Sequence, residues 1–199
     1  MVYWLVRGFF IFVIRVFLNV RVEGLENIPK DGPLIVCANH ISWWDPVLVT
    51  CTNRRVIHWM GKVELFRYPV FGTIIKHAHA FPVDRGKPDM SSIRHSLAVL
   101  KASGVVGIFP EGHREHELGV FGEMHPGAAL IALRGRCPVI PVAIRGRCGF
   151  RNTITLAYGK PITLEGKTGR ASRDMDEGVR VITLAIRTLW ESLGQEEVA

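Results

Sequence analysis

The chain alternates short apolar runs of β-like composition with helix-like segments, and this alternation restricts the fold more than any other feature. The predicted strands cover residues 20–24, 34–38, 55–60, 79–83, 105–109, 138–144 and 153–159. The predicted helices cover residues 45–53, 69–76, 88–102, 126–134 and 172–193. Strands that alternate with helices along a chain are typical of α/β sandwiches. We therefore expect an α/β fold with a mixed, largely parallel sheet flanked by helices.

Local signals mark the ends of two of these segments. Pro88 is expected to open the helix at 88–102, with Asp89 in its first turn, because both residue types are favoured there. The segment EGKTGRASRD (165–174) is the best loop candidate and leads into the last helix. No internal repeat or low-complexity linker occurs, so the 199 residues predict one domain, or one domain with an appendage.

The composition is sufficient for a substantial core. Hydrophobic residues make up 48% of the chain and charged residues 22%, which excludes wholesale disorder. The four cysteines form no C-x-x-C pair, and Cys37 and Cys137 lie in strand-like runs, where small buried thiols are common. We interpret the cysteines as reduced and structural, which predicts a cytoplasmic location.

The first twenty residues, MVYWLVRGFFIFVIRVFLNV, are the most apolar part of the chain. At the helical period their polar side chains gather on about half of the circumference: Arg7, Arg15, Asn19 and Arg21. The remaining arc is apolar and carries Trp4, Leu5, Phe9, Phe12, Val13, Val16 and Phe17. This pattern predicts a membrane-interfacial helix over residues 1–20, with its basic face toward water, followed by a domain at 21–199.

Two alternatives for this helix stay open: it covers the protein's own core, or it inserts into the bilayer at a tilt. A full span is less well supported, because it needs about 20 apolar residues and would place Arg7 and Arg15 in the hydrocarbon. A signal peptide is poorly supported, since the chain lacks a basic start and an A-x-A cleavage site.

The net charge of +7 predicts an anionic partner, such as an anionic bilayer surface or a phosphorylated substrate. Nucleic acid is not expected, because the chain has no zinc-finger spacing, RNP-like aromatic motif or Lys/Arg tract. The sequence carries no indication of an oligomeric state.

Three predicted strands end in unusual polar groups. LIVCA is followed by NHISWWDP (39–46), HAFPV by DRG (84–86) and VVGIF by PEGHRE (110–115). In an α/β sheet, ligands collect beyond the carboxyl ends of the strands. A single histidine after a strand is usually structural, whereas three such strand ends in a short chain favour a functional site.

His40 and Asp45 are five residues apart across a predicted strand-to-helix turn, with Pro46 beginning the helix. This spacing lets Asp45 fold back onto the imidazole ring, where a carboxylate fixes the tautomer and stabilises the imidazolium. No G-x-S-x-G elbow and no cysteine beside a basic group supplies a nucleophile. We therefore expect His40 to act as a general base on a hydroxyl of a bound substrate.

These motifs resemble the sequence blocks of the glycerolipid acyltransferases, the family of 1-acyl-glycerol-3-phosphate acyltransferases. NHISWWD has the family's H-x-x-x-x-D form, and FPEGHR (109–114) resembles its F-P-E-G-[T/S]-R block. The segment from GKVELF to FPVDRG (61–86) is similar to the second block, and CPVIPVAI (137–144) to the fourth. Four blocks in the right order, over about residues 34–144, make the resemblance specific.

The resemblance implies an enzyme at the cytoplasmic face of the cell membrane, bound peripherally or monotopically. It would move a fatty acyl group from acyl-CoA or acyl-carrier protein to the hydroxyl of lysophosphatidic acid, giving phosphatidic acid. By this analogy His40 is the general base and Asp45 orients it. No cofactor, metal or covalent acyl-enzyme is expected, since a thioester is already activated.

The acceptor's phosphate requires cations, and arginine binds phosphate through two parallel hydrogen bonds. By the resemblance, Arg85 in the second block and Arg114 at the end of the third are phosphate-binding candidates, and Lys62 is a further one. Glu111 and Gly112, in the Pro-Glu-Gly turn, complete the predicted substrate site; Glu111 would position the glycerol or support the cations. The alternatives are solvated surface charges for the cations and a turn residue for Glu111.

Two positions depart from the family pattern. His113 replaces the Thr or Ser of the third block and adds a titratable ring. Residues 123–130, EMHPGAAL, lack the lysines that many members carry there, although Gly127 still offers free amides at a helix N-terminus. A lysolipid acceptor other than lysophosphatidic acid therefore stays open.

Trp43 and Trp44 lie inside the first block and have two interpretations. They line the access route of an acyl chain or lysolipid, or they pack between sheet and helix. Because bulky aromatics dominate core burial, we expect at least one of them to pack. Asn39 and Ser42 are assigned supporting or structural roles.

Two rival functions remain. One is a metal-dependent hydrolase that uses His77 and His79, or the acids and histidines of EGHREHE (111–117); it is weakly supported, because no complete ligand set occurs. The other is a non-enzymatic protein that binds anionic lipid through the N-terminal helix and the net charge. The His40–Asp45 pair argues against the second, because lipid binding needs only basic and apolar surface.

Overall fold

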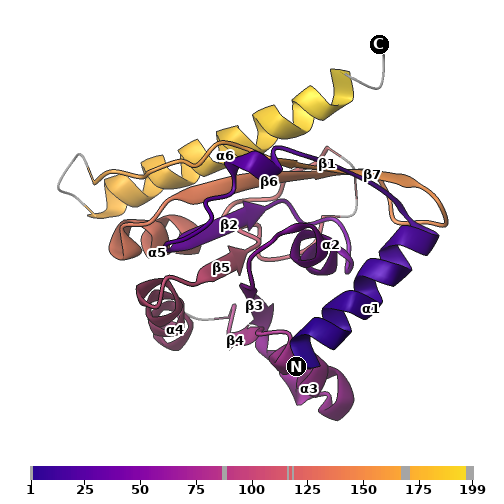
Figure 1. Ribbon diagram of the computed structural model, residues 1–199. Helices are drawn as coiled ribbons and strands as arrows, with labels where there is room; N and C mark the ends of the chain where they lie inside the picture. Colours follow the sequence, from indigo (N-terminus) through magenta and orange to yellow (C-terminus); the bar gives the residue numbers. More distant parts are fainter. Residues whose placement is uncertain (1, 87–88, 116, 118, 167–170, 196–199) are drawn as a thin grey trace.

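The computed structural model describes residues 2–86, 89–115, 117, 119–166 and 171–195. Its strands form one seven-stranded sheet in the order β1-β7-β6-β2-β5-β3-β4 (Figure 1). The strands are β1 (Asn19–Glu23), β2 (Leu34–Ala38), β3 (Ile57–Lys62), β4 (Phe81–Val83), β5 (Val105–Ile108), β6 (Val139–Arg145) and β7 (Thr153–Tyr158). The β6–β7 pair is antiparallel and the other neighbouring pairs are parallel. The predicted α/β class and mixed, largely parallel sheet are confirmed.

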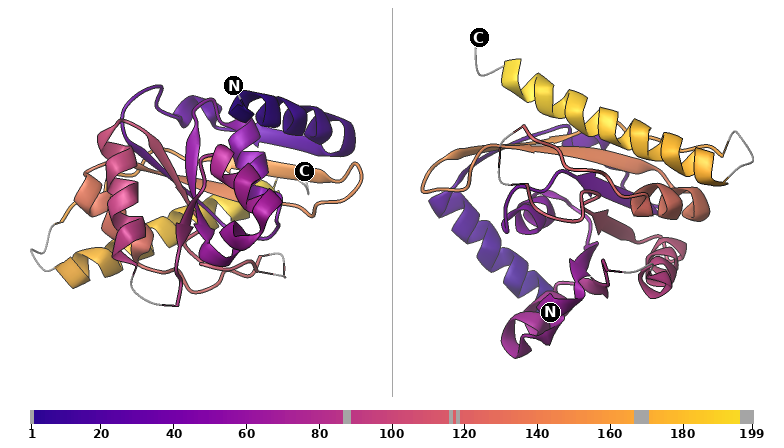
Figure 2. Two further views of the ribbon diagram at one scale, coloured as in Figure 1. Left: turned by 90° about the horizontal axis from the view of Figure 1, so that it is seen from below. Right: turned by 180° about the vertical axis from the view of Figure 1, so that it is seen from behind.

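Helices connect the strands and cover both faces of the sheet. They are α1 (Val2–Phe17), η1 (Leu25–Asn27), α2 (Asp45–Thr52), η2 (Val63–Arg67), α3 (Pro69–His77), α4 (Met90–Lys101), α5 (Gly127–Gly135) and α6 (Ala171–Gln195). In Figure 2, α6 and α5 lie next to each other on one side of the sheet, with α4 next to α5, and α1 lies on the other side. β2 is buried along its whole length, as expected for a central strand that is covered on both faces.

Two hydrophobic clusters separate the faces of the sheet. On one face, Leu48 and Val49 of α2 and Ile14 of α1 pack against alternate residues of β2, β6 and β7. On the other face, the opposite side chains of β2 and β5 pack against α4, α5 and α6. Alternate residues of a strand point to opposite faces, so each central strand contributes to both clusters.

Each predicted strand and helix corresponds to an observed element, with shifts at some ends. Asp89 is the N-cap of α4 rather than a first-turn residue, because its side chain accepts the backbone N–H groups of Ser91 and Ser92. Pro88 lies outside the described residues. The predicted loop at 165–174 is shorter than expected, since α6 begins at Ala171; residues 167–170 lie outside the described part.

Helix α1 ends at Phe17, and β1 begins at Asn19, so the predicted boundary at residue 20 falls inside a strand. The predicted basic face is therefore wrong in part, because Asn19 and Arg21 belong to β1. Arg7 is only partly exposed. It donates hydrogen bonds to the carbonyl oxygens of Thr50, Cys51 and Asn53, at the carboxyl end of α2.

The two faces of α1 have different surroundings. Tyr3 and Ile14 are buried against the protein, so the helix does cover part of the core. The opposite face leaves large apolar side chains in solvent: Trp4, Leu5, Phe9, Phe12, Val16 and Phe17. Among the described residues, no helix has the length and apolar character that a membrane span requires.

The four cysteines, all in the described part of the chain, form no disulfide. Cys37 and Cys137 are buried, as predicted, and burial raises the pKa of Cys137 to about 11. Their thiols are therefore protonated side chains of the core.

Candidate active site

The three polar strand ends meet at one edge of the sheet. Strands β2, β5, β3 and β4 are neighbours and parallel, so their carboxyl ends point the same way. Two hydrogen bonds connect the segments that follow them. The backbone N–H of His40 donates to Glu111 Oε1 at 3.2 Å, and Arg85 donates to the carbonyl oxygen of Gly112.

Asp45 is the central acceptor of the turn after β2. Its Oδ2 lies 2.8 Å from His40 Nδ1 and accepts the backbone N–H groups of Ile41 and Ser42, both at 2.7 Å. Asp45 is 0% exposed, whereas the His40 side chain keeps 12% exposure. An ionised carboxylate only accepts hydrogen bonds, so this contact favours the neutral tautomer in which Nδ1 carries the proton and Nε2 keeps its lone pair. The predicted contact between Asp45 and the His40 ring is confirmed.

Residues of the third sequence block make further contacts that immobilise His40. The backbone N–H of Glu115 donates to the carbonyl oxygen of His40 at 2.8 Å. The imidazole stacks on Phe109 with ring centroids 4.1 Å apart, and Phe109 stacks on Trp59 at 4.7 Å. The sequence-based site lacked Phe109 and Trp59. Phe109 is the first residue of FPEGHR, so its position in that block could have indicated a place in the site. Trp59 lies outside the blocks, and the sequence carries no such indication for it.

Glu111 is 1% exposed and does not line the cavity described below. Desolvation raises the pKa of Glu111 to about 7, although hydrogen bonds from the backbone amides of His40 and Gly122 oppose the rise. Its side chain holds the His40 backbone rather than reaching open space. The structure thus places Glu111 against the His40 backbone and outside the cavity lining, and its predicted contact with glycerol stays a prediction.

A cavity of about 420 Å³ lies beside His40, within the size range of small-molecule sites. Its walls come from α1, α2, β3, η2 and α3. Most lining side chains are apolar and include Val6, Phe10, Val47, Leu65, Phe71 and Ile75. Polar side chains also reach it, among them His40, Lys62 and Arg85. The cavity is therefore mainly apolar, with a few polar and cationic side chains in its lining.

The three predicted cations have different positions. Lys62 and Arg85 line the cavity with His40. Lys62 also lies 3.3 Å from Glu64, in an ion pair whose two side chains are about half exposed. Arg114 does not line the cavity; its guanidinium lies 3.9 Å from the ring centroid of Trp43. The structure thus brings Lys62 and Arg85 to His40 and leaves Arg114 against an aromatic ring.

The two departures from the family pattern lie outside the cavity lining. His113 Nε2 is 2.8 Å from Glu115 Oε1, so the ring contacts a neighbouring residue of the same segment. Gly127 begins α5, as predicted. Neither residue lines the cavity with His40, so the structure assigns them no contact with a substrate there.

No group of three or more His, Cys, Asp or Glu residues with metal-binding proximity occurs in the described part of the chain. His79 instead contacts the rings of Tyr3 and His58, with centroids 5.2 and 5.0 Å away. His116, one of the residues of the metal-site alternative, lies outside the described residues.

The two tryptophans of the first block have different surroundings. Trp44 packs against the core and meets Phe10 edge to face, which confirms that at least one of them packs. Trp43 is 57% exposed and lines the cavity. Asn39 is structural, since its side chain exchanges two hydrogen bonds with the backbone of Ile144 on β6.

These features define the chemistry that the site supports. An imidazole with a free Nε2 can accept a proton from a hydroxyl at the cavity wall. The apolar wall suits a hydrocarbon chain, and the neighbouring cations suit an anionic headgroup. The combination fits the activation of a lipid hydroxyl.

Comparison with known proteins agrees with this geometry. The family model described as "Acyltransferase" matches residues 19–145. The 1-acyl-sn-glycerol-3-phosphate acyltransferase of Bacillus subtilis is 38% identical over 129 residues, which cover 64% of this chain and 63% of that protein. The enzyme of the same name from Streptococcus pneumoniae is 32% identical over 186 residues, covering 89% of this chain and 67% of that protein.

A solved structure shows the same fold. The crystal structure of the 1-acyl-sn-glycerophosphate (LPA) acyltransferase PlsC from Thermotoga maritima matches with a TM-score of 0.77 and 25% identity. The match covers 96% of this chain and 79% of that one. The aligned region of the Bacillus relative is thus less than two thirds of its length, whereas the structural match includes nearly all of this chain.

Proposed function

This chain belongs to the acyltransferase family, and we propose that it transfers a fatty acyl group from an acyl thioester to the free hydroxyl of 1-acyl-glycerol-3-phosphate, giving phosphatidic acid. The observation that carries the proposal is the His40–Asp45 pair at the wall of an apolar cavity that Lys62 and Arg85 also line. The names of the Bacillus and Streptococcus relatives support this acceptor.

In this proposal His40 Nε2 removes the proton of the acceptor hydroxyl as the oxygen attacks the thioester carbonyl carbon. A C–O bond forms, the C–S bond breaks, and the leaving thiolate takes the proton from the imidazolium. Asp45 holds the reactive tautomer and stabilises the imidazolium through its charge. The thioester is already activated, so a positioned base and proximity are the main requirements.

Arg85 and Lys62 are the proposed phosphate ligands. A guanidinium has five N–H donors, so the hydrogen bond of Arg85 to Gly112 uses one of them and fixes the side chain. The ion pair of Lys62 with Glu64 is half exposed, and such pairs contribute little stability, so exchanging Glu64 for a phosphate costs little. Arg114 is left out of this set, because its guanidinium lies on Trp43.

The donor is proposed to be acyl-CoA or acyl-carrier protein, with its acyl chain in the apolar cavity. Each methylene group that leaves water contributes about 0.8 kcal/mol, so the cavity walls supply a large part of donor affinity. No cofactor or metal takes part in the proposed reaction.

We also propose that the protein acts at the cytoplasmic face of the cell membrane, held by the exposed apolar face of α1. Fully burying a large apolar side chain contributes about 1.5–3 kcal/mol, and α1 exposes six of them. The net charge of +7 adds attraction to anionic lipid.

The test is a panel of lysolipids incubated with the purified protein and either acyl-CoA or acyl-carrier protein, with products identified by mass spectrometry. Formation of phosphatidic acid from lysophosphatidic acid is the expected result. Transfer to another lysolipid alone would keep the His40 mechanism and replace the acceptor. Other lysolipids are included because His113 replaces the Thr or Ser of the family pattern.

A further inference from the structure

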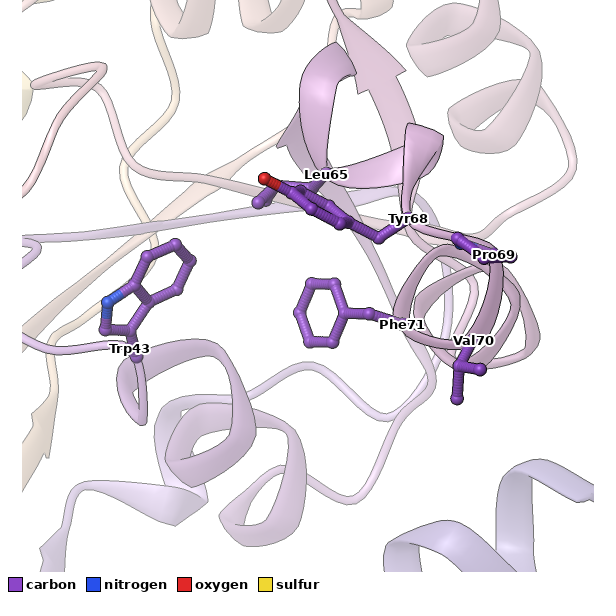
Figure 3. Close-up of a pocket in the computed structure, with 6 residues that line it drawn as sticks. All are labelled: Trp43, Leu65, Tyr68, Pro69, Val70 and Phe71. Atoms are coloured by element: carbon purple, nitrogen blue, oxygen red, sulfur yellow. The ribbon is translucent and has the colours of Figure 1, made fainter.

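A second apolar depression lies on the outside of the cavity wall. It has a volume of about 570 Å³ and is lined by Trp43, Leu65, Tyr68, Pro69, Val70 and Phe71. We call this depression the outer groove and the cavity beside His40 the inner cavity. In Figure 3 the rings of Trp43 on one side and of Tyr68 and Phe71 on the other face a common space.

The outer groove and the inner cavity share a wall. Trp43, Leu65 and Phe71 line both of them. Tyr68 and Val70 line the outer groove alone and are 63% and 73% exposed. A hydrocarbon in the groove would therefore lie within one side chain of a hydrocarbon in the cavity.

The proposed reaction brings two hydrocarbon chains to one base. The thioester carbonyl carbon and the acceptor hydroxyl must both reach His40 Nε2, and each carries its own acyl chain away from that point. Two apolar sites with a common wall, one of which is lined by His40, satisfy this requirement, whereas a single cavity would hold both chains side by side.

We propose that the outer groove binds the acyl chain already present on the lysolipid acceptor, while the inner cavity binds the chain that is transferred. This inference rests on the proposed function. An acceptor that comes from a bilayer needs a site open to the surface, because its chain can then remain partly in lipid. The groove is open in this way: Tyr68, Val70 and Phe71 are all exposed.

A charge beside the groove supports a phospholipid occupant. Arg114 lies on the ring of Trp43, which forms the groove wall opposite Tyr68. The proposed phosphate ligands Lys62 and Arg85 line the inner cavity on the other side of the shared wall, and Arg114 adds positive charge next to that wall without binding the phosphate. The groove therefore has the chemistry of a lysophospholipid site, an apolar trough with a basic residue beside one wall.

The experiment compares Tyr68→Ala with Ala78→Leu and with Leu184→Ala. Tyr68 lines the groove only, Ala78 lines the cavity only, and Leu184 is an exposed residue of α6 that lines neither. Each variant is assayed in mixed detergent micelles with a short-chain and a long-chain lysophosphatidic acid, and with short and long acyl-CoA donors. Vesicle binding is measured in parallel.

For Tyr68→Ala we expect kcat/KM with the long-chain acceptor to fall on the order of tenfold, the effect of exposing about two methylene groups. Its activity with the short-chain acceptor and its preference among donors should match the wild type. Ala78→Leu should change the donor preference instead, and Leu184→Ala should change nothing.

An equal loss for both acceptors, or a loss explained by weaker vesicle binding, would overturn the assignment of the groove and identify it as membrane-docking surface. A change in donor preference by Tyr68→Ala would overturn it as well. If the wild type acylates no lysolipid at all, the proposed function itself fails. That outcome is distinct, because it is seen without any variant.

Discussion

The turn at residues 39–46 and helix α1 depart from the usual distribution of side chains in opposite directions. In the turn, the polar side chains of Asn39 and Asp45 are buried and held by hydrogen bonds. In α1, the apolar side chains of Leu5, Phe9 and Phe12 are between 61% and 67% exposed. Burying a charge and exposing a large apolar patch both oppose folding, so each departure indicates a function. The first fits the proposed chemistry of His40 and Asp45, and the second fits the proposed surface for lipid.

The largest expected effect separates the turn from α1. His40→Ala should lower thiol release from acyl-CoA by about 10²–10⁴-fold, because a positioned general base contributes that much. Binding to anionic vesicles should stay as in the wild type, since α1 is unchanged. The control is His77→Ala, an exposed histidine at the end of α3 that lines neither apolar site. Wild-type turnover in His40→Ala would refute the catalytic assignment.

The reciprocal change is Leu5→Ser, Phe9→Ser and Phe12→Ser together. Vesicle affinity should fall by at least about a hundredfold, because each buried large apolar side chain is worth about 1.5–3 kcal/mol. Turnover of a soluble short-chain acceptor should be retained. Deleting residues 1–20 is a poorer test, since it also removes Arg7 and the start of β1. If the triple variant binds vesicles as the wild type does, another surface docks the protein.

The buried support of the turn should be visible in the pH dependence of stability. The pKa of Glu111 is about 7 in the folded protein against an ordinary value of 4.5, so the folded state binds more protons between these values. The contribution of Glu111 is therefore fully present below about pH 4.5 and is lost as the pH rises through about 7. The loss should be on the order of 3 kcal/mol, and urea unfolding across this range measures it.

Glu111→Gln is the matched variant, because a neutral amide still accepts the His40 backbone N–H and does not ionise. Its stability should lack this pH-dependent component. Parallel pH profiles for the wild type and the variant would contradict this prediction, because they would mean that Glu111 has the same pKa in the folded and unfolded states.

The smallest expected effect concerns the connection between the two regions. Arg7 of α1 holds the carboxyl end of α2, whose first residue is Asp45. Arg7→Ala should lower the free energy of unfolding by about 1–3 kcal/mol, because three carbonyl groups lose a charged donor. Arg7→Lys should lower the free energy of unfolding by less, since an ammonium group can still donate some of the hydrogen bonds that the guanidinium makes. Urea unfolding of the three proteins checks this order; equal stabilities would mean that α1 and α2 are not energetically connected.

Local sequence information predicted much of this protein. Apolar periodicity and turn residues depend on neighbours in the chain, and they located the strands, most helix ends and the break after LIVCA. The five-residue spacing of His40 and Asp45 was equally local, so the contact of Asp45 with the ring could be expected. The uncovered apolar arc of α1 also follows from its period.

Tertiary structure alone decided which distant residues meet. The sheet order sets β5 beside β2 and so puts Phe109 under His40 and Glu111 behind it. It also ties Arg7 to the carboxyl end of α2 and leaves Arg114 out of the cavity lining that includes Lys62 and Arg85. These contacts join residues far apart in the chain, and no local pattern encodes a non-local distance. The sequence by itself determined the elements and the contact between His40 and Asp45, whereas the packing of strand upon strand decided what supports that contact and set the two apolar sites side by side.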